Sequence, residues 1–165
     1  MKKLSIVLFI LTLAVLGCTK GTEEKAAEKA IETATGKKVE ADLSDGSVKL
    51  KSEDGTFEMT SGDSAELPEG FPKDVYVYEN ASIQMAMDMP HGMSVGLHTS
   101  DGVRKVSDAY KKAMEKEGWK KFSATDAGDS YHLVYGKEQE DRMAQITIAR
   151  EDDKTVIALS ISRKQ

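Results

Sequence analysis

The chain has 165 residues and a formal net charge of −5, with 28 acidic against 23 basic side chains. An acidic chain binds nucleic acid or anionic lipid headgroups poorly, because both carry negative charge. With a single cysteine the chain cannot form an internal disulfide, so its stability has to come from packing. The length suits one domain or two small ones.

The first 17 residues have the three-part layout of a secretory signal peptide. Two lysines precede an uncharged run of 13 residues, 4–16, and Gly17 stands just before Cys18. The run is too short for a membrane-spanning helix, which needs about 20 apolar residues. The sequence therefore predicts an exported protein whose residues 1–17 are the signal peptide.

Val15-Leu16-Gly17-Cys18 resembles the lipobox of bacterial lipoproteins. In that family the cysteine sulfur receives a diacylglyceryl group, the peptide is cut before the cysteine, and the new amino group is acylated. The resemblance implies that Cys18 is the lipidation site and that acyl chains, such as palmitate, bind the lipid bilayer. The alternative is an ordinary signal peptide that happens to contain a cysteine.

Removal of the signal peptide takes away two lysines and leaves 148 residues with a net charge of −7. We therefore expect the acyl chains to be the membrane contact, since each buried methylene contributes about 0.8 kcal/mol and several chains hold far longer than one. Thr19 follows the cysteine where an aspartate could stand. This resembles the sorting pattern for the outer membrane, facing the periplasm, in hosts with two membranes.

The first folded unit is predicted to be residues 22–60, after a short lipidated tether at 18–21. Residues 22–35 have apolar side chains at helical spacing. Asp-Gly dipeptides, which favour tight hairpins, then separate three alternating runs, at 39–43, 47–51 and 56–60. This pattern indicates a helix on a three-stranded meander. Residues 61–74 are a linker that holds two of the three prolines.

The second unit, residues 75–163, is predicted to contain one helix among antiparallel strands. Apolar residues from Val103 to Met114 recur at helical spacing, with Ser100 or Asp101 as the cap and Gly118 just past the end. Strand patterns occupy 75–78, 83–89, 93–99, 119–126, 130–136, 142–150 and 155–163. Together they predict an α+β fold, in which one helix covers an antiparallel sheet. We expect this unit to fold without the first.

Three stretches carry a second resemblance: Leu67-Pro68-Glu69-Gly70-Phe71-Pro72-Lys73-Asp74-Val75, the helix end with Tyr110-Lys111-Lys112 and Glu117-Gly118-Trp119, and the paired Asp-Gly turns. They resemble a group of uncharacterised bacterial lipoproteins. The resemblance covers most of the mature chain and implies export and a helix-and-sheet domain. It implies no activity and no site residue beyond the lipidated cysteine.

We expect no enzymatic activity and no cofactor. The single cysteine is assigned to lipid, we expect no serine in a nucleophile elbow, and His91, His98 and His132 form no His-Glu-x-x-His motif. His98 and His132 are expected to face solvent. Phosphate-binding loops and calcium loops are not recognisable. The sequence therefore favours a non-enzymatic binding or structural module for an envelope protein, a cell-wall component or a small ligand.

Five soft donors crowd into nine residues: Met85, Met87, Met89, His91 and Met93. Thioether sulfur and imidazole favour Cu(I), so a soft-metal-binding lipoprotein is the alternative function. However, strand alternation is expected to aim the first three methionines at the face that holds Val95 and Leu97, and methionine is an ordinary core filler. We expect core packing, with metal binding or a methionine-rich surface for a partner as the alternatives.

Overall fold

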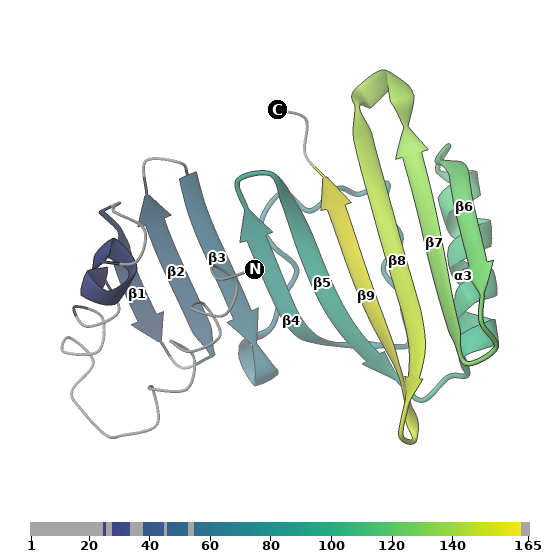
Figure 1. The fold of residues 1–165 in the computed structure, drawn as a ribbon. Helices are drawn as coiled ribbons and strands as arrows, with labels where there is room; N and C mark the ends of the chain where they lie inside the picture. The colour runs from purple at the N-terminus through teal and green to yellow at the C-terminus, as the bar shows by residue number, and fades with distance from the viewer. Residues whose placement is uncertain (1–24, 26–27, 34–37, 45, 53–54, 163–165) are drawn as a thin grey trace.

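In the computed structural model the chain forms one antiparallel sheet, with the long helix α3 against one face (Figure 1). The structure describes residues 25, 28–33, 38–44, 46–52 and 55–162. α3 spans Val103–Lys116, and two short 3-10 helices are η1 (Gly62–Ser64) and η2 (Glu138–Glu140). The strands are β1 (Glu40–Ser44), β2 (Ser47–Ser52), β3 (Gly55–Ser61), β4 (Ser82–Met89), β5 (Gly92–Thr99), β6 (Lys120–Asp126), β7 (Ser130–Lys137), β8 (Arg142–Glu151) and β9 (Lys154–Ser162). The predicted α+β class is confirmed.

The strand order in the sheet is β1-β2-β3-β4-β5-β9-β8-β7-β6, with antiparallel pairing throughout. The last strand, β9, therefore lies between β5 and β8. β3 pairs with β4 through residues 58–61 and 85–88, on either side of the predicted linker. The backbone ladder thus joins the two predicted units into one continuous sheet (Figure 1).

The apolar core lies between α3 and the half of the sheet made by β5, β9, β8 and β7. Val106, Tyr110 and Met114 project from one stripe of α3 and are 0% exposed, which confirms the predicted helical stripe. Every second residue of the four strands packs in the same core as these helix residues, including Val95, Leu97, Leu133, Tyr135, Ile146, Ile148, Ile157 and Leu159. Gly118, at φ +80°, follows the end of α3 as predicted, because glycine adopts this conformation without strain.

Two local predictions are wrong. The segment 75–78 is irregular and not a strand. Its buried side chains, Val75 and Tyr78, pack into the core beside α3, so their alternation reflects a covering segment. Asp101 does not cap α3 either: Gly102 is the N-cap residue, and no side chain closes the helix start. The Asp101 carboxylate is engaged elsewhere, by Tyr78 and Lys105.

An irregularity in the pairing of β4 with β5, between Ile83 and Met85, decides which side chains of β4 face α3. Beyond it, Ala86 lies opposite the buried Val95, and Met87 lies opposite Ser94. Directly paired residues share a face, so an extra residue moves the following side chains to the other side. The prediction that the β4 methionines pack in the core opposite Val95 and Leu97 is therefore wrong. Ala86 is 3% exposed and Met85 is 37% exposed.

Part of the N-terminal helix that the sequence predicts at 22–35 is described. Residue 25 and residues 28–33 are helical, and the remainder of that prediction, together with Cys18, lies outside the described residues. The carboxylate of Glu28 accepts a hydrogen bond of 3.0 Å from the backbone N–H of Ala41 in β1. This contact places the helical residues beside β1.

Candidate functional site

A groove of about 530 Å³ lies between the irregular segment before β4 and the C-terminal part of α3. Its walls come from Leu67, Phe71, Pro72, Lys73, Val75, Tyr76, Val77 and Glu79 on the segment, and from Ala113, Lys116 and Glu117 on the helix. This volume lies within the range of small-molecule sites, about 300–1,000 Å³. We refer to these residues as the segment groove.

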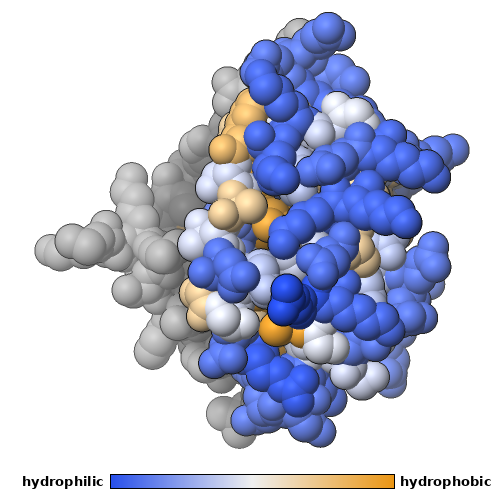
Figure 2. Space-filling view, turned by 90° about the vertical axis from the view of Figure 1, so that its right-hand side faces the viewer, coloured by the Kyte–Doolittle hydropathy of each residue, from blue (hydrophilic) through white to orange (hydrophobic). Residues whose placement is uncertain are grey.

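The segment groove has an apolar floor and a charged rim. Phe71, Tyr76 and Ala113 are half-buried within it. The rim carries two cations and two anions, all exposed: Lys73, Lys116, Glu79 and Glu117. The wider side of the molecule that presents α3 and β6 is mostly hydrophilic, with small apolar patches (Figure 2). The floor therefore offers apolar contact, and the balanced rim selects for neither sign of charge.

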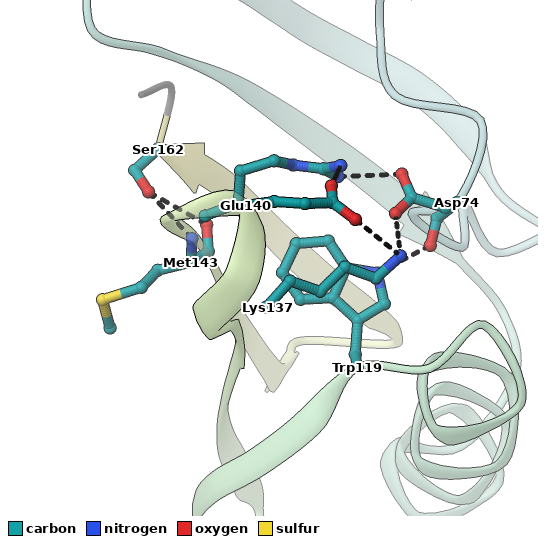
Figure 3. Close-up of polar contacts among 7 residues, drawn as sticks. Asp74, Trp119, Lys137, Glu140, Met143 and Ser162 are labelled. Atoms are coloured by element: carbon teal, nitrogen blue, oxygen red, sulfur yellow. Dashed lines mark hydrogen bonds and ion pairs between the residues drawn. The ribbon is translucent and has the colours of Figure 1, made fainter. Parts of the chain in front are cut away.

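A polar cluster fixes the segment to the sheet at Asp74 (Figure 3). We call it the Asp74 clamp; it consists of Asp74, Trp119, Lys137, Glu140 and Arg142. The Asp74 carboxylate accepts hydrogen bonds from Lys137 and, at 2.8 Å, from Arg142. The indole N–H of Trp119 donates to the Asp74 carbonyl at 2.8 Å. Both the side chain and the main chain of Asp74 are thus held.

The two cations of the Asp74 clamp also lie near the Trp119 ring. The Lys137 ammonium is 5.4 Å and the Arg142 guanidinium carbon 4.9 Å from the ring centroid. Glu140 pairs with Arg142 at 2.6 Å, so the positive charges are balanced by two carboxylates. Partial burial acts to raise the pKa of Asp74, but hydrogen bonds from Arg142 and Lys137 outweigh it and hold that pKa below its usual value.

Three tyrosines fix the C-terminal end of the segment. Tyr76 packs edge-on against Tyr110 of α3, with ring centroids 5.3 Å apart, and Tyr78 stacks on Tyr110 at 6.5 Å. Burial, followed by the hydrogen bond to Asp101, raises the pKa of Tyr78 to about 12. Burial also raises the pKa of Tyr110. The phenols of Tyr78 and Tyr110 therefore stay protonated at neutral pH and act through packing and hydrogen bonding.

The predicted metal donors do not converge on one point. Met85, Met87 and Met89 lie on the face that α3 does not cover, because their partners are Gly96, Ser94 and Gly92. Met93 is 3% exposed and belongs to the opposite face, and His91 is exposed in the turn. Within the described ranges no group of three or more His, Cys, Asp or Glu side chains could hold a metal ion.

His98 and His132 lie on the same uncovered face but on separated strands. β5 carries His98 and β7 carries His132, with β9 and β8 between them. His132 is exposed, in agreement with its predicted orientation, and its Nδ1 lies 3.1 Å from the Thr147 hydroxyl. His98 is half-buried. The two imidazoles therefore do not form a pair.

One stretch, Gly92-Met93-Ser94-Val95-Gly96, has the spacing Gly-x-Ser-x-Gly, contrary to the expectation from the sequence. A nucleophile elbow requires a sharp turn from a strand into a helix, whereas these residues lie within β5. The Ser94 hydroxyl lies 3.3 Å from the Leu159 carbonyl and 3.1 Å from the Ser160 hydroxyl. Neither partner is a general base, so the spacing is coincidental here.

Sequence reasoning assigned residues 61–74 to a linker and so missed the segment groove and the Asp74 clamp. A usable signal was present: apolar and aromatic side chains gather around and just after Pro72, at Phe71, Val75, Tyr76 and Val77. A flexible connection rarely contains so many large apolar side chains. Their density indicated a segment that packs against the domain.

Residues 81–155 match a family model described as START domain-like. This range begins just before β4 and ends at the start of β9, and so includes β5, α3, β6, β7 and β8. No curated protein and no solved structure matches the chain. The matched region is compatible with a non-enzymatic module that binds a ligand. None of the helices in the described part of the chain is long and apolar enough to cross a membrane.

Proposed function

We propose that this protein is an exported, lipid-anchored lipoprotein of the cell envelope that binds a small amphipathic molecule in the segment groove. The observation that carries the binding proposal is the apolar floor of this groove, part of which lies on a segment that is anchored at Asp74 and at Tyr78. Asp74 is held by Lys137 and Arg142, and Tyr78 is held by Asp101. A preorganised site loses less entropy when it binds.

The ligand class follows from the lining. Half-buried aromatic and aliphatic groups such as Phe71, Tyr76 and Ala113 would contact an apolar body of the ligand. Lys73 and Lys116 would meet an anionic group on the rim, and Glu79 and Glu117 a cationic one. No catalytic role is proposed for these groups, and the protein would act by binding alone.

Membrane attachment is the second part of the proposal, and it rests on Val15-Leu16-Gly17-Cys18. Acyl chains on Cys18 would hold the domain at the membrane surface, on the periplasmic side of the outer membrane where the host has two membranes. Cys18→Ser removes the sulfur that accepts the lipid. This variant should lose palmitate labelling and leave the membrane fraction. Sedimentation of the Cys18→Ser variant with membranes after a carbonate wash would contradict the lipid anchor at Cys18.

The binding proposal is tested with 1-anilinonaphthalene-8-sulfonate, an amphipathic aromatic probe whose emission rises in apolar surroundings. Ala113→Gln places a larger polar side chain in the groove and should weaken probe binding at least about fivefold, equal to roughly 1 kcal/mol. Lys112→Gln is the matched control, because Lys112 is exposed on α3 and outside the lining. Equal probe affinity in both variants would reject the groove as the binding site.

Trp119 provides an independent signal for the same experiment. It is the single tryptophan of the chain. Its indole N–H donates a hydrogen bond to the backbone carbonyl of Asp74, within the groove segment. A ligand that contacts the segment should change the tryptophan emission, and Ala113→Gln should reduce that change.

A further inference from the structure

We propose that Met59, Met85 and Met87 form a binding site for a soft monovalent metal ion, Cu(I), on the face of the sheet opposite α3. This proposal is independent of the segment groove. Its donor set differs from the one in the alternative that the sequence left open, since Met93 faces α3 and His91 stands in the turn. The new donor, Met59, comes from β3 of the first unit.

The register of β3 and β4 brings the first two sulfur donors together. Met59 lies directly opposite Met87 in the antiparallel ladder. Side chains paired in this way share a face, and their Cβ atoms are about 4.5–5.5 Å apart. The side chains therefore stand beside each other on the face that α3 does not cover.

Met85 adds a third donor on the same face. It stands two residues from Met87 in β4 and diagonally across the ladder from Met59, and diagonal neighbours are about 7–8 Å apart. Each methionine has three rotatable side-chain bonds, so the three thioethers can converge on one ion. Met85 is 37% exposed, which gives an ion access from solvent.

The surroundings leave room on one side and provide an apolar wall on the other. On the β5 side, Met87 faces Ser94 and Met85 faces Gly96, both small. On the β2 side, Met59 lies opposite Val48. No large side chain of β5 is thus paired with Met85 or Met87.

The donor chemistry selects the ion. Neutral thioethers bind soft Cu(I) in preference to Mg²⁺, Ca²⁺ or Mn²⁺, which require oxygen ligands. The carboxylate of β4, Asp88, pairs with Met93 and so belongs to the other face. The three methionines therefore offer neutral sulfur with no carboxylate of β4 on their face, which suits Cu(I).

The test is a titration of the full chain carrying Cys18→Ser with Cu(I) under reducing conditions, against a chromogenic Cu(I) chelator as competitor; the substitution removes a thiol that would itself bind Cu(I). We expect one ion per chain at micromolar affinity or tighter. Met87→Leu keeps the side-chain volume and should weaken binding at least tenfold. Met143→Leu and Met93→Leu are matched controls, the first exposed on β8 and the second buried toward α3, and should change the affinity less than twofold.

Two further readouts keep the proposal testable if a variant folds poorly. Addition of Ag(I), a redox-inert soft ion, to methyl-labelled protein should shift the methyl resonances of Met59, Met85 and Met87 and leave Met93 and Met143 in place. The affinity should also be the same at pH 5 and pH 7.5, because thioethers do not titrate. Loss of affinity in acid would instead indicate imidazole, which coordinates only when neutral.

Three results would each overturn the proposal: no ion bound at micromolar concentration, equal weakening in Met143→Leu, or unchanged affinity in Met87→Leu. None of them bears on the groove, because the probe and the metal report on different residues. A failed groove experiment would likewise leave the metal site standing.

Discussion

The hydroxyl of Tyr78 donates a hydrogen bond of 2.7 Å to the carboxylate of Asp101, which ties the groove segment to the turn before α3. The same turn is held from β9, since the Thr155 hydroxyl donates to the Asp101 carbonyl at 2.6 Å. The Thr99 hydroxyl donates to the Asn80 carbonyl, also at 2.6 Å. Segment, helix start and central sheet therefore meet at one junction.

Replacement of Tyr78 by phenylalanine should lower the melting temperature by a few degrees. The change keeps the ring stacked on Tyr110 but removes the donor to Asp101, and a hydrogen bond to a charged group contributes more than a neutral one. Tyr76→Phe is the control, since no hydrogen bond of the Tyr76 hydroxyl is described. Thermal melts followed by circular dichroism measure both, and equal losses would exclude a special role for the Tyr78–Asp101 bond.

Alkaline pH should destabilise the fold between about pH 10 and pH 12. Burial raises the pKa of Tyr78 and of Tyr135 to about 12, whereas an unfolded tyrosine ionises near 10. The unfolded chain thus releases protons first, and stability falls as pH rises through this window. Denaturant midpoints measured from pH 8 to pH 12 test this. A midpoint that stays constant up to pH 12 would contradict the burial of these phenols.

Asp74→Asn should cost about 1 kcal/mol at pH 7, somewhat less than is usual for hydrogen bonds to charged groups, because the carboxylate is partly solvated. The low pKa of Asp74 means that its contribution is present above about pH 4 and is lost as pH falls through the folded-state pKa. The stability difference between the variant and the natural chain should therefore shrink as pH falls below about 4, the ordinary pKa of an aspartate. Glu140→Gln, at a more exposed position of the clamp, should cost less at pH 7.

Val106→Ala should cost about 2 kcal/mol or more and lower the melting temperature by several degrees. Val106 is 0% exposed under α3, and truncation of a buried aliphatic side chain leaves a cavity that the core does not fill. Arg104→Ala, two residues away and exposed, is the control. A loss of similar size in both variants would show that the packing of Val106 is not its source, because alanine is the better helix former at both positions.

A chain that begins at residue 72 should fold by itself. The core cluster runs from Val75 to Ile161 and includes no residue of β1, β2 or β3. This truncation removes the β3–β4 ladder and the packing of Phe71 against the core. A cooperative thermal melt is expected. A gradual, non-cooperative transition would show that the first three strands are required for folding.

Most of the secondary structure could be predicted because local signals were strong. The α3 stripe from Val106 to Met114 and the Asp-Gly turns between the early strands have direct physical causes in helical spacing and tight-turn geometry. Partners distant in sequence could not be found this way. The pairing of Met59 with Met87 depends on how the chain returns after residues 62–81, and no local pattern encodes that return.

The errors also have local physical reasons. Strand alternation in β4 was followed correctly from Met85 to Met89, but the irregularity after Ile83 reversed its direction relative to the core. In residues 75–78, alternating large side chains indicated a strand, but Tyr76 and Tyr78 instead pack on Tyr110. The Asp74 clamp combines three distant parts of the chain, so its members could not be grouped from spacing alone.

The position of β9 has a consequence for the order of folding. β9 comes last in sequence among the strands of the described residues, and it separates β5 from β8. Until residues 154–162 are available, each of those strands has an unsatisfied hydrogen-bonding edge toward the gap. A chain emerging from its N-terminal end therefore completes its sheet only when its final strand has arrived. For a protein exported as proposed here, this delay would keep the chain open during passage and favour folding after release.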